Sequence, residues 1–365
     1  MSSSIHRGYI KYFLLLPPLG ILLMAQRVRS QDSTGAKIEF SGFVDAYYSK
    51  NFAEPISRTN KLRNFDVAED QFNLSLAELV VQKKAAPVGF RFDLDFGSTN
   101  DLVQPGNGST LSVLQQGYLS AVLPVGNGLT LDAGKFVTHM GYEAIESKDN
   151  WNYSRSFLFA YAVPYYHTGI RLTYPVSGAF TAALHIVNGW NSGVDNNKWK
   201  SLGLMLNYSI NSSTSLILNV MDGIEESEPV IAGKKIVFDF IVTQQLTEAL
   251  SLSLNADYGN ELTLSGMALW KGAALYGKYT LGAKSAIAIR AEVYYDPIGY
   301  TTGVPFPKAT FKETTVTYDY RPFDQLIVRG EFRDDFSNNG LFDKKTSAGT
   351  QTSQGTLLVG IVALF

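Results

Sequence analysis

Apolar and polar residues alternate along this chain from residue 38 to its last residue, and this period of two restricts the fold more than any other feature. The clearest stretch is 250–258, in which every even position is apolar and every odd position is polar. Charge follows the same rule, since Arg91, Asp93 and Asp95 alternate with phenylalanine and leucine. Successive side chains of a β-strand point to opposite faces, so the pattern predicts strands with one apolar and one polar face. The chain is therefore expected to be all-β.

About sixteen strands are expected, with connections that alternate in length. The strand centres lie near residues 44, 76, 92, 119, 132, 170, 184, 203, 218, 239, 254, 273, 290, 316, 330 and 360. Short turns are expected at residues 84–87, 124–128, 175–178, 211–213, 246–249, 282–284 and 321–324. Between them come longer segments, at residues 51–70, 98–112, 138–164, 225–233, 296–307 and 336–353.

These connections separate two fold classes that share the alternating pattern. A soluble β-sandwich also has strands with one apolar and one polar face. Tight turns that alternate with long loops are instead typical of a barrel in an outer membrane, with its turns in the periplasm and its loops outside the cell. We therefore expect a closed antiparallel transmembrane β-barrel. A barrel of sixteen to eighteen strands is wide enough to hold a water-filled channel, which the polar faces would line.

The first thirty residues have the three parts of a secretory signal peptide. Basic Arg7 and Lys11 precede an apolar core at 12–25, and small residues at 28–30 offer a cleavage site. A membrane anchor is the alternative, although the apolar core is short for a spanning helix. We expect cleavage after residue 30 and one barrel domain over residues 31–365. Removing four basic residues from 31 basic and 33 acidic leaves 27 against 33, a net charge of −6, which is unsuited to nucleic-acid binding.

Composition excludes several other classes of protein. The chain has no cysteine, so it forms neither disulfide bonds nor a zinc site built on thiolates. After the signal peptide, no apolar run reaches the length of about eighteen residues that marks a transmembrane helix. The sequence also indicates no cofactor.

The segment 357–365 ends in Phe365 and is apolar throughout. Its length of about ten residues fits a tilted transmembrane strand and is too short for a transmembrane helix. A buried strand of a soluble sheet is the alternative. In the barrel interpretation, the segment closes the sheet against residues 38–48, Phe365 serves as a signal to the barrel-assembly machinery, and alternate side chains contact outer-membrane lipid. The lipid-facing residues would be Leu357, Val359, Ile361, Ala363 and Phe365.

Three groups of short motifs resemble one known family, the OmpL-like outer-membrane β-barrel porins, also called the β-barrel porin-2 group. The motifs are 41–48 with Asn51-Phe52, 152–156 with Pro164 and 167–169, and 187–191. The resemblance covers essentially the whole mature chain. It implies a general or solute-selective porin for small hydrophilic solutes, with a homotrimer as a candidate assembly and without catalytic residues.

The loop at 138–164 is the longest connection that combines aromatic and charged residues. In porins of about sixteen strands the third loop folds into the lumen and narrows it. If this loop does the same, its charged side chains face charged residues of the wall across water, and fixed charges in a narrow passage govern which ions pass. The alternative is a loop that packs over the rim and pairs its charges locally. The loop residues are Glu143, Glu146, Lys148, Asp149 and Arg155, and the wall residues are Arg91, Asp93, Asp95, Arg171, Arg290, Glu292, Arg329, Glu331 and Arg333.

Other chemistries have weaker support in the sequence. His139, His167 and His185 are too scattered along the chain to match a metal-ligand motif. The acidic run at 225–228 lacks the ligand spacing of a calcium loop. A lipid or peptide hydrolase needs a histidine beside a hydroxyl nucleophile, and His185 has no evident Ser and Asn partners. An adhesin or receptor on a barrel scaffold remains an alternative to the channel. The net charge favours cations slightly as the transported ions.

Overall fold

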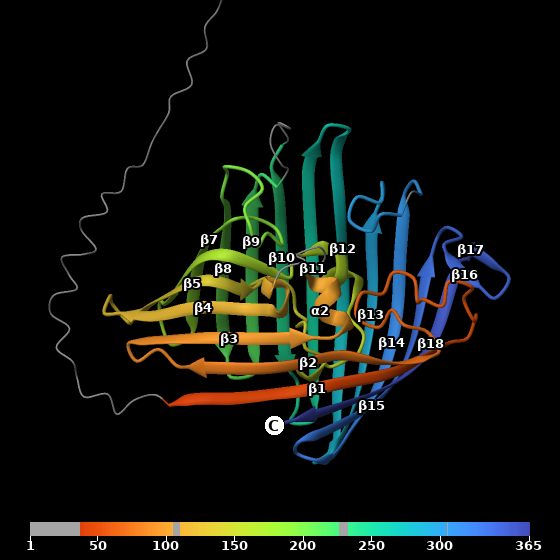
Figure 1. The fold of residues 1–365 in the computed structure, drawn as a ribbon, viewed down its shortest axis with the longest axis horizontal. Helices are drawn as coiled ribbons and strands as arrows, with labels where there is room; N and C mark the ends of the chain where they lie inside the picture. Colours follow the sequence, from red (N-terminus) through yellow and green to blue (C-terminus); the bar gives the residue numbers. More distant parts are fainter. Residues whose placement is uncertain (1–36, 105–109, 226–232, 305) are drawn as a thin grey trace, which may run out of the picture. The chain divides into compact units, whose positions relative to one another are not determined.

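Sixteen strands close into one antiparallel barrel in the computed structural model of the protein (Figure 1). The structure describes residues 37–104, 110–225, 233–304 and 306–365, so the expected signal peptide lies outside the described residues. The barrel strands are β1 (Ile38–Asn51), β2 (Gln71–Lys83), β3 (Val88–Phe96), β4 (Leu114–Leu123), β5 (Leu129–Val137), β6 (Tyr166–Pro175), β7 (Phe180–Val187), β8 (Ser201–Asn211), β9 (Thr214–Gly223), β10 (Lys235–Gln245), β11 (Leu250–Thr263), β12 (Gly266–Gly282), β13 (Ser285–Asp296), β14 (Ala309–Phe323), β15 (Leu326–Ser337) and β18 (Ser353–Leu364). All sixteen expected strand centres fall within these strands.

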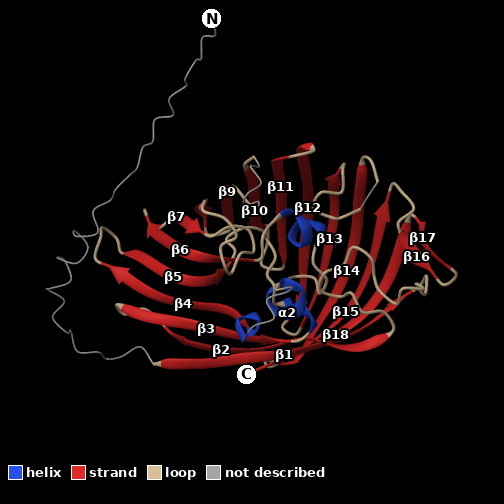
Figure 2. Ribbon diagram, turned by 45° about the horizontal axis from the view of Figure 1, so that its top comes forward, coloured by secondary structure: helices blue, strands red, loops and turns tan. Residues whose placement is uncertain are grey.

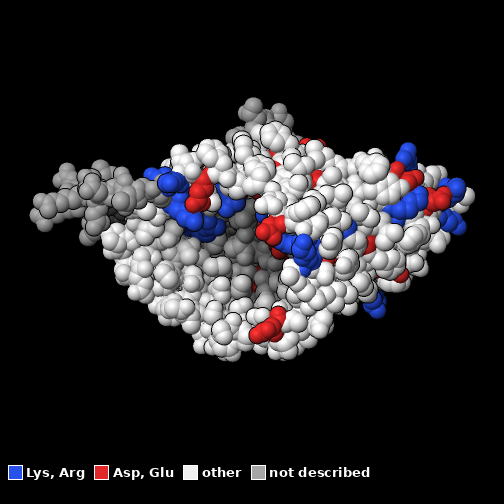
Figure 3. Space-filling view, turned by 90° about the horizontal axis from the view of Figure 1, so that it is seen from below, with Lys and Arg blue, Asp and Glu red and all other residues white. Residues whose placement is uncertain are grey.

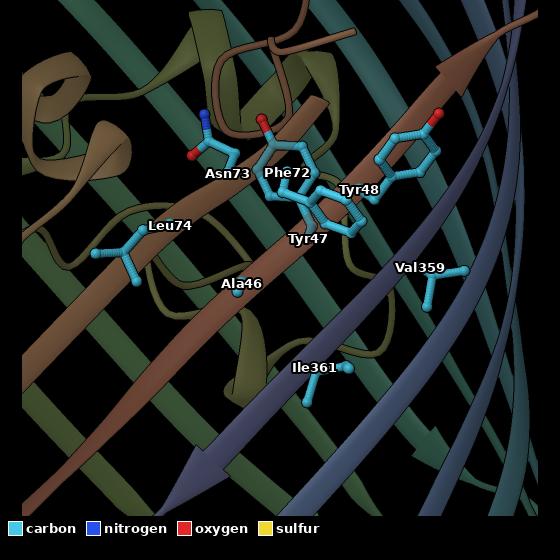
Figure 4. Close-up of a pocket in the computed structure, with 8 residues that line it drawn as sticks. All are labelled: Ala46, Tyr47, Tyr48, Phe72, Asn73, Leu74, Val359 and Ile361. Atoms are coloured by element: carbon cyan, nitrogen blue, oxygen red, sulfur yellow. The ribbon is translucent and has the colours of Figure 1, made fainter. Parts of the chain in front are cut away.

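The barrel closes where β18 pairs with β1. Their register runs from Phe43 opposite Leu364 to Asn51 opposite Thr356, and the backbone of Phe365 exchanges hydrogen bonds of 3.0 and 3.2 Å with that of Gly42. The expected closure of the last strand against the first is thus confirmed. On the outer surface of this seam, side chains of β1, β2 and β18 line an apolar groove of about 480 Å³ (Figure 4).

The apolar face of the strands points outward and the polar face mainly inward, which is the reverse of the arrangement in a soluble protein. In β18, the outward residues Leu357, Val359 and Ile361 are each nearly half exposed, whereas Leu358 and Val362, at alternate positions, are buried. Elsewhere the buried, inward positions are mainly polar or charged, because a lipid-facing wall requires apolar side chains outside and leaves polar ones for the interior. Ala363 and Phe365 also lie on the outward face, as expected.

The connections follow the expected alternation with one exception. The turn expected at 321–324 is narrower, since β14 extends to Phe323 and β15 begins at Leu326. A long connection at 188–200, not among the expected segments, lies between two short turns and fits the alternation. On the same end, β11 and β12 are joined by residues 264 and 265 alone, because these strands run for 14 and 17 residues and consume the length that a loop would have had.

Short helices and one hairpin lie within the long loops. They are α2 (Ser98–Val103) and η2 (Thr110–Val113) in the second loop, η3 (Ser147–Asp149) and the π-helical turn η4 (Leu158–Ala162) in the third, and the hairpin of β16 (Phe342–Lys344) and β17 (Ser347–Gln351) in the last. Several helical turns are seen inside the ring of strands (Figure 2). Within the described ranges, no helix is long and apolar enough to cross a membrane.

Candidate functional site: a loop folded into the barrel

The third long loop, residues 138–165, lies inside the barrel and touches strands on several sides of its wall. Gly141 donates its backbone N–H to Asp239 of β10 at 2.7 Å. Tyr153 donates its hydroxyl to Asp45 of β1 at 2.7 Å. The indole of Trp270 on β12 donates to the carbonyl of Ala162 at 3.2 Å. Contacts to β1, β10 and β12 cannot be made by a loop that covers only the rim, so the loop occupies the lumen.

Two inward carboxylates hold the backbone of this loop. Glu331 on β15 accepts the N–H groups of Tyr153 and Ser154 at 2.5 and 2.9 Å. Glu292 on β13 accepts those of the next pair, Phe157 and Leu158, at 2.7 Å each. Buried backbone amides need hydrogen-bond partners, and a charged acceptor forms stronger bonds than a neutral one. Each carboxylate therefore satisfies two consecutive amides that entry into the barrel removes from water.

Three inward arginines hold the carbonyls of the loop in the same way. Arg329 donates to the carbonyls of Ser147 and of Asn150, the latter at 2.8 Å. Arg333 donates to the carbonyl of Arg155 at 2.6 Å. Arg290 donates to the carbonyl of Ser154 at 2.6 Å and forms an ion pair with Glu143 of the loop at 2.7 Å.

Each of these arginines is also neutralised by a carboxylate of the wall. Arg290 pairs with Glu313 at 2.6 Å, Arg329 with Asp319 at 2.7 Å and Arg333 with Asp335 at 2.7 Å. All three guanidinium groups are fully buried. The expectation that they face the loop across water is therefore wrong, because the loop rests directly on them. Glu143, Glu292 and Glu331 are likewise buried in this contact.

Arg155 acts within the loop and does not face the wall. Its guanidinium donates to the carbonyls of Ala144, Ile145 and Tyr153, and it lies 4.5 Å from the ring centroid of Phe65. Burial lowers the pKa of this arginine. Arg155 thus stabilises the fold of the loop. For this one residue, the alternative in which the loop pairs its charges locally is the one observed.

The first long loop, residues 52–70, covers the third. The ring of Phe65 packs against Phe159 and Tyr165, with centroids 5.9 and 5.8 Å apart. Asn64 donates to the carbonyl of Ala160 at 3.1 Å and to the hydroxyl of Tyr165 at 2.8 Å. These contacts restrain the C-terminal part of the third loop.

Five of the predicted charged residues keep part of their surface exposed. Seen from the end that carries the short turns, the molecule is hollowed, with charged side chains at the edge of the hollow (Figure 3). Arg91 and Arg171 are 33% and 23% exposed and pair with Asp93 and Asp132, each at 2.8 Å. At the tip of the loop, Glu146 accepts a hydrogen bond of 2.8 Å from Gln115 of β4. Lys148 and Asp149 beside it pair at 2.5 Å.

Asp93 and Asp95 are fully buried on β3. They belong to a marked excess of negative charge in the interior: among the described residues, eighteen acidic and five basic side chains are buried. Both carboxylate oxygens of Asp95 lack a hydrogen-bond partner. Acidic side chains therefore outnumber basic ones among the buried residues that the structure describes.

Three histidines that are far apart in the sequence lie close together beside the base of the loop. The rings of His139 and His185 stack with centroids 4.0 Å apart, and His167 lies 5.8 Å from His139. Burial, with the neighbouring His167 as a second cause, lowers the pKa of His139 to about 3. Their separation along the sequence, which matches no metal-ligand motif, gave no sign of this convergence. Within the described ranges, however, no group of histidine and acidic residues is arranged to hold a metal ion.

The sequence pattern did not identify several residues that hold the loop. Asp239 accepts from Gly141, Asn255 accepts from the backbone of Tyr142 at 3.4 Å, and Glu313 neutralises Arg290. Asp239 is hard to single out because the inward positions on either side of it, Val237 and Ile241, are as apolar as the outward ones. Asn255 lies in the clearest alternating stretch, so its inward direction could have been read from the pattern.

A closed sixteen-stranded barrel with an apolar outer wall, a charged interior and a loop folded into its lumen defines the class of outer-membrane porins. The chain belongs to the family described as "beta-barrel porin-2, OmpL-like", whose model matches residues 37–365. The protein is therefore a porin-type channel of the bacterial outer membrane. No curated protein matches the chain in sequence.

Solved porin structures share its fold at low sequence identity. The anion-selective porin from Comamonas acidovorans is 12% identical with a TM-score of 0.62, and the match covers 90% of this chain and 99% of that one. The outer-membrane channel DcaP of Acinetobacter baumannii is 10% identical with a TM-score of 0.62, covering 91% and 98%. The trimer form of OmpT from Vibrio cholerae is 11% identical with a TM-score of 0.59, covering 90% and 99%. These likenesses show the fold alone.

Proposed function

We propose that the protein is a water-filled channel for passive diffusion of small hydrophilic solutes and ions, with a preference for cations. The observation that carries the preference is the charge of the interior, where eighteen acidic side chains but only five basic ones are buried among the described residues. The basic groups assigned to the proposed passage, Arg91, Arg171 and Lys148, are each paired with a carboxylate. Paired arginines attract anions weakly, whereas the surplus carboxylates attract cations from solution.

The passage runs, in this proposal, between the tip of the third loop and the wall formed by β3 to β6. Its sides carry the five partly exposed residues: Arg91 and Arg171 on the wall, and Glu146, Lys148 and Asp149 on the loop. The deeply buried residues have a different role, which is to fix the loop so that the width of the passage is constant. In a narrow passage such fixed charges determine which ions pass.

The setting of the channel follows from the outer face of the barrel and from the family. We propose that residues 1–30 direct export and are removed, that residues 31–365 form the single barrel domain, and that the barrel-assembly machinery inserts it. The apolar outer wall would contact lipid. A homotrimer is the proposed assembly, and the apolar groove at the seam lies on the surface available to lipid or to a second copy (Figure 4).

Recording from the purified protein in planar lipid bilayers tests the channel. We expect discrete conductance steps in potassium chloride. Deleting residues 141–150, the part of the loop that reaches across the lumen, should increase the conductance, because it removes η3 and its charges. A barrel that folds and inserts but never conducts would contradict the proposal and favour an adhesin or receptor. Unchanged conductance and ion preference in the deletion variant would contradict the assignment of the constriction.

A further inference from the structure

Aromatic side chains line a pocket of about 310 Å³ at the end of the barrel that carries the long loops. Trp270 comes from β12, Trp190 from the connection 188–200, and Tyr300 from the connection 297–308. Tyr161 and Tyr165 come from the third loop. Four separate parts of the chain thus supply five aromatic residues to one cavity, and three of the four are loops.

The rings present both a flat surface and an edge. Trp270 and Tyr300 stack with centroids 5.7 Å apart and planes at 27°. Trp190 stands perpendicular to Trp270, at 90° and 6.4 Å. Trp270 is fully buried, so the rings that a ligand can reach are the partly exposed Trp190 and Tyr300. Flat aromatic faces bury apolar surface at a low cost in side-chain entropy, so they hold ligands that have one apolar face.

The charges within the pocket cancel. The Lys235 ammonium lies 4.6 Å from the ring centroid of Trp190 and 5.6 Å from that of Tyr300, and it forms an ion pair of 3.0 Å with buried Glu261. The protein's own cation thus already lies over one face of each of these rings, so a cationic ligand gains little from them. The carboxylate of Glu261 in turn neutralises the ammonium, so an anionic ligand gains little.

Polar groups that can bind a neutral ligand remain beside the rings. Asn191 uses its side-chain oxygen to accept the backbone N–H of Tyr165 at 2.6 Å, so its remaining polar group is an N–H donor. Burial raises the pKa of Tyr161 and that of Tyr165. Both hydroxyls therefore stay protonated at physiological pH. That of Tyr165 is already used, since it donates to the carbonyl of Ala160 at 2.9 Å and accepts from Asn64.

We propose that this pocket binds a neutral sugar at the outer mouth of the channel. A sugar ring presents a row of C–H groups that packs on an aromatic face, and hydroxyls around its edge that pair with polar groups. The volume lies at the lower end of the range of about 300–1,000 Å³ for ligand pockets, which suits one or two sugar rings. This inference rests on the proposed channel function and names a class of solute for it.

Single-channel recording with sugar added on one side tests the inference. We expect glucose and sucrose to interrupt the potassium chloride current in a saturable way. Trp190→Leu should weaken this block by about tenfold or more, the usual cost of losing a central aromatic anchor. Trp199→Leu is the matched control, because Trp199 belongs to the same connection but is exposed and outside the pocket. Tyr300→Leu provides a second variant if Trp190→Leu folds poorly.

Tryptophan fluorescence of the purified protein gives a readout that does not depend on conduction. The chain has four tryptophans, two of which line the pocket, so sugar binding should change their emission, and Trp190→Leu should reduce that change. A conducting channel with neither block nor fluorescence change up to high sugar concentrations overturns the sugar site while the channel stands. Block by benzoate but not by sugars overturns it as well. A change of tryptophan emission on sugar binding, in a protein that does not conduct, supports the sugar site and contradicts the channel.

Discussion

Replacing Glu331 by Gln should release the third loop from the barrel wall. The carboxylate accepts two backbone N–H groups of the loop and the hydroxyl of Thr317 at 2.7 Å. Glutamine keeps one acceptor oxygen but presents an NH₂ group to an N–H donor, so one bond is lost and the other loses its charge. Hydrogen bonds to charged groups contribute about 1.5–3 kcal/mol each, so the docked loop should lose about 2–3 kcal/mol.

A buried thiol can report this change, because the chain has no cysteine of its own. Ser154 is fully buried and carries one of the two amides that Glu331 anchors, and Ser154→Cys is nearly isosteric. If labelling by a thiol reagent requires the loop to open, the rate follows the opening equilibrium. A loss of about 2–3 kcal/mol then raises the labelling rate about 30- to 150-fold.

The control is Glu39→Gln in the same Ser154→Cys background. Glu39 is an exposed carboxylate on β1 that contacts Gln82 and Lys84, so its replacement changes charge without touching the loop. We expect its labelling rate to equal that of the parent. If Glu331→Gln labels no faster than the parent, or if both variants accelerate equally, the carboxylate does not anchor the loop.

Two further predictions concern pH and assembly. The pKa of His139 falls from 6.5 to about 3 in the folded protein, so the unfolded chain takes up this proton first, and stability is lost as the pH falls from 6.5 towards 3. His139→Gln should remove that loss, about 1–2 kcal/mol at pH 5, and a Tm difference from wild type that does not change between pH 7.5 and pH 5 would contradict it. Deleting Phe365 removes both backbone bonds to Gly42 and should reduce the folded, heat-modifiable fraction in the outer membrane more than it reduces export. Normal assembly of that variant would count against an assembly role for Phe365.

The sequence predicted the fold well because a membrane imposes its pattern on every strand. Lipid requires an apolar outer face, so inward positions stand out wherever they are polar, and all sixteen strand centres could be located. Strand ends carry no such signal. The lengths of β11 and β12 were therefore not predicted. Only residues 264 and 265 connect these strands, at a position where the alternation of turns and loops predicts a long loop.

The candidate site was predicted less completely, because alternation shows which way a side chain points and not what covers it. Arg290, Arg329 and Arg333 were correctly placed on the inner face, yet water does not separate them from the loop. The contact between Glu143 and Arg290 joins residues 147 positions apart, and only the path of the loop through the barrel brings them together. The convergence of His139 with His167 and His185 has the same origin.

The reversal potential in a gradient of potassium chloride tests the central claim most directly. The interior has more carboxylates than basic groups, and its arginines are paired. We therefore expect a reversal potential with the sign of a channel in which potassium carries more current than chloride. Glu146→Gln with Asp149→Asn should move this potential towards zero, since both side chains belong to the proposed passage. A wild-type potential of the opposite sign, in which chloride dominates, would contradict the account.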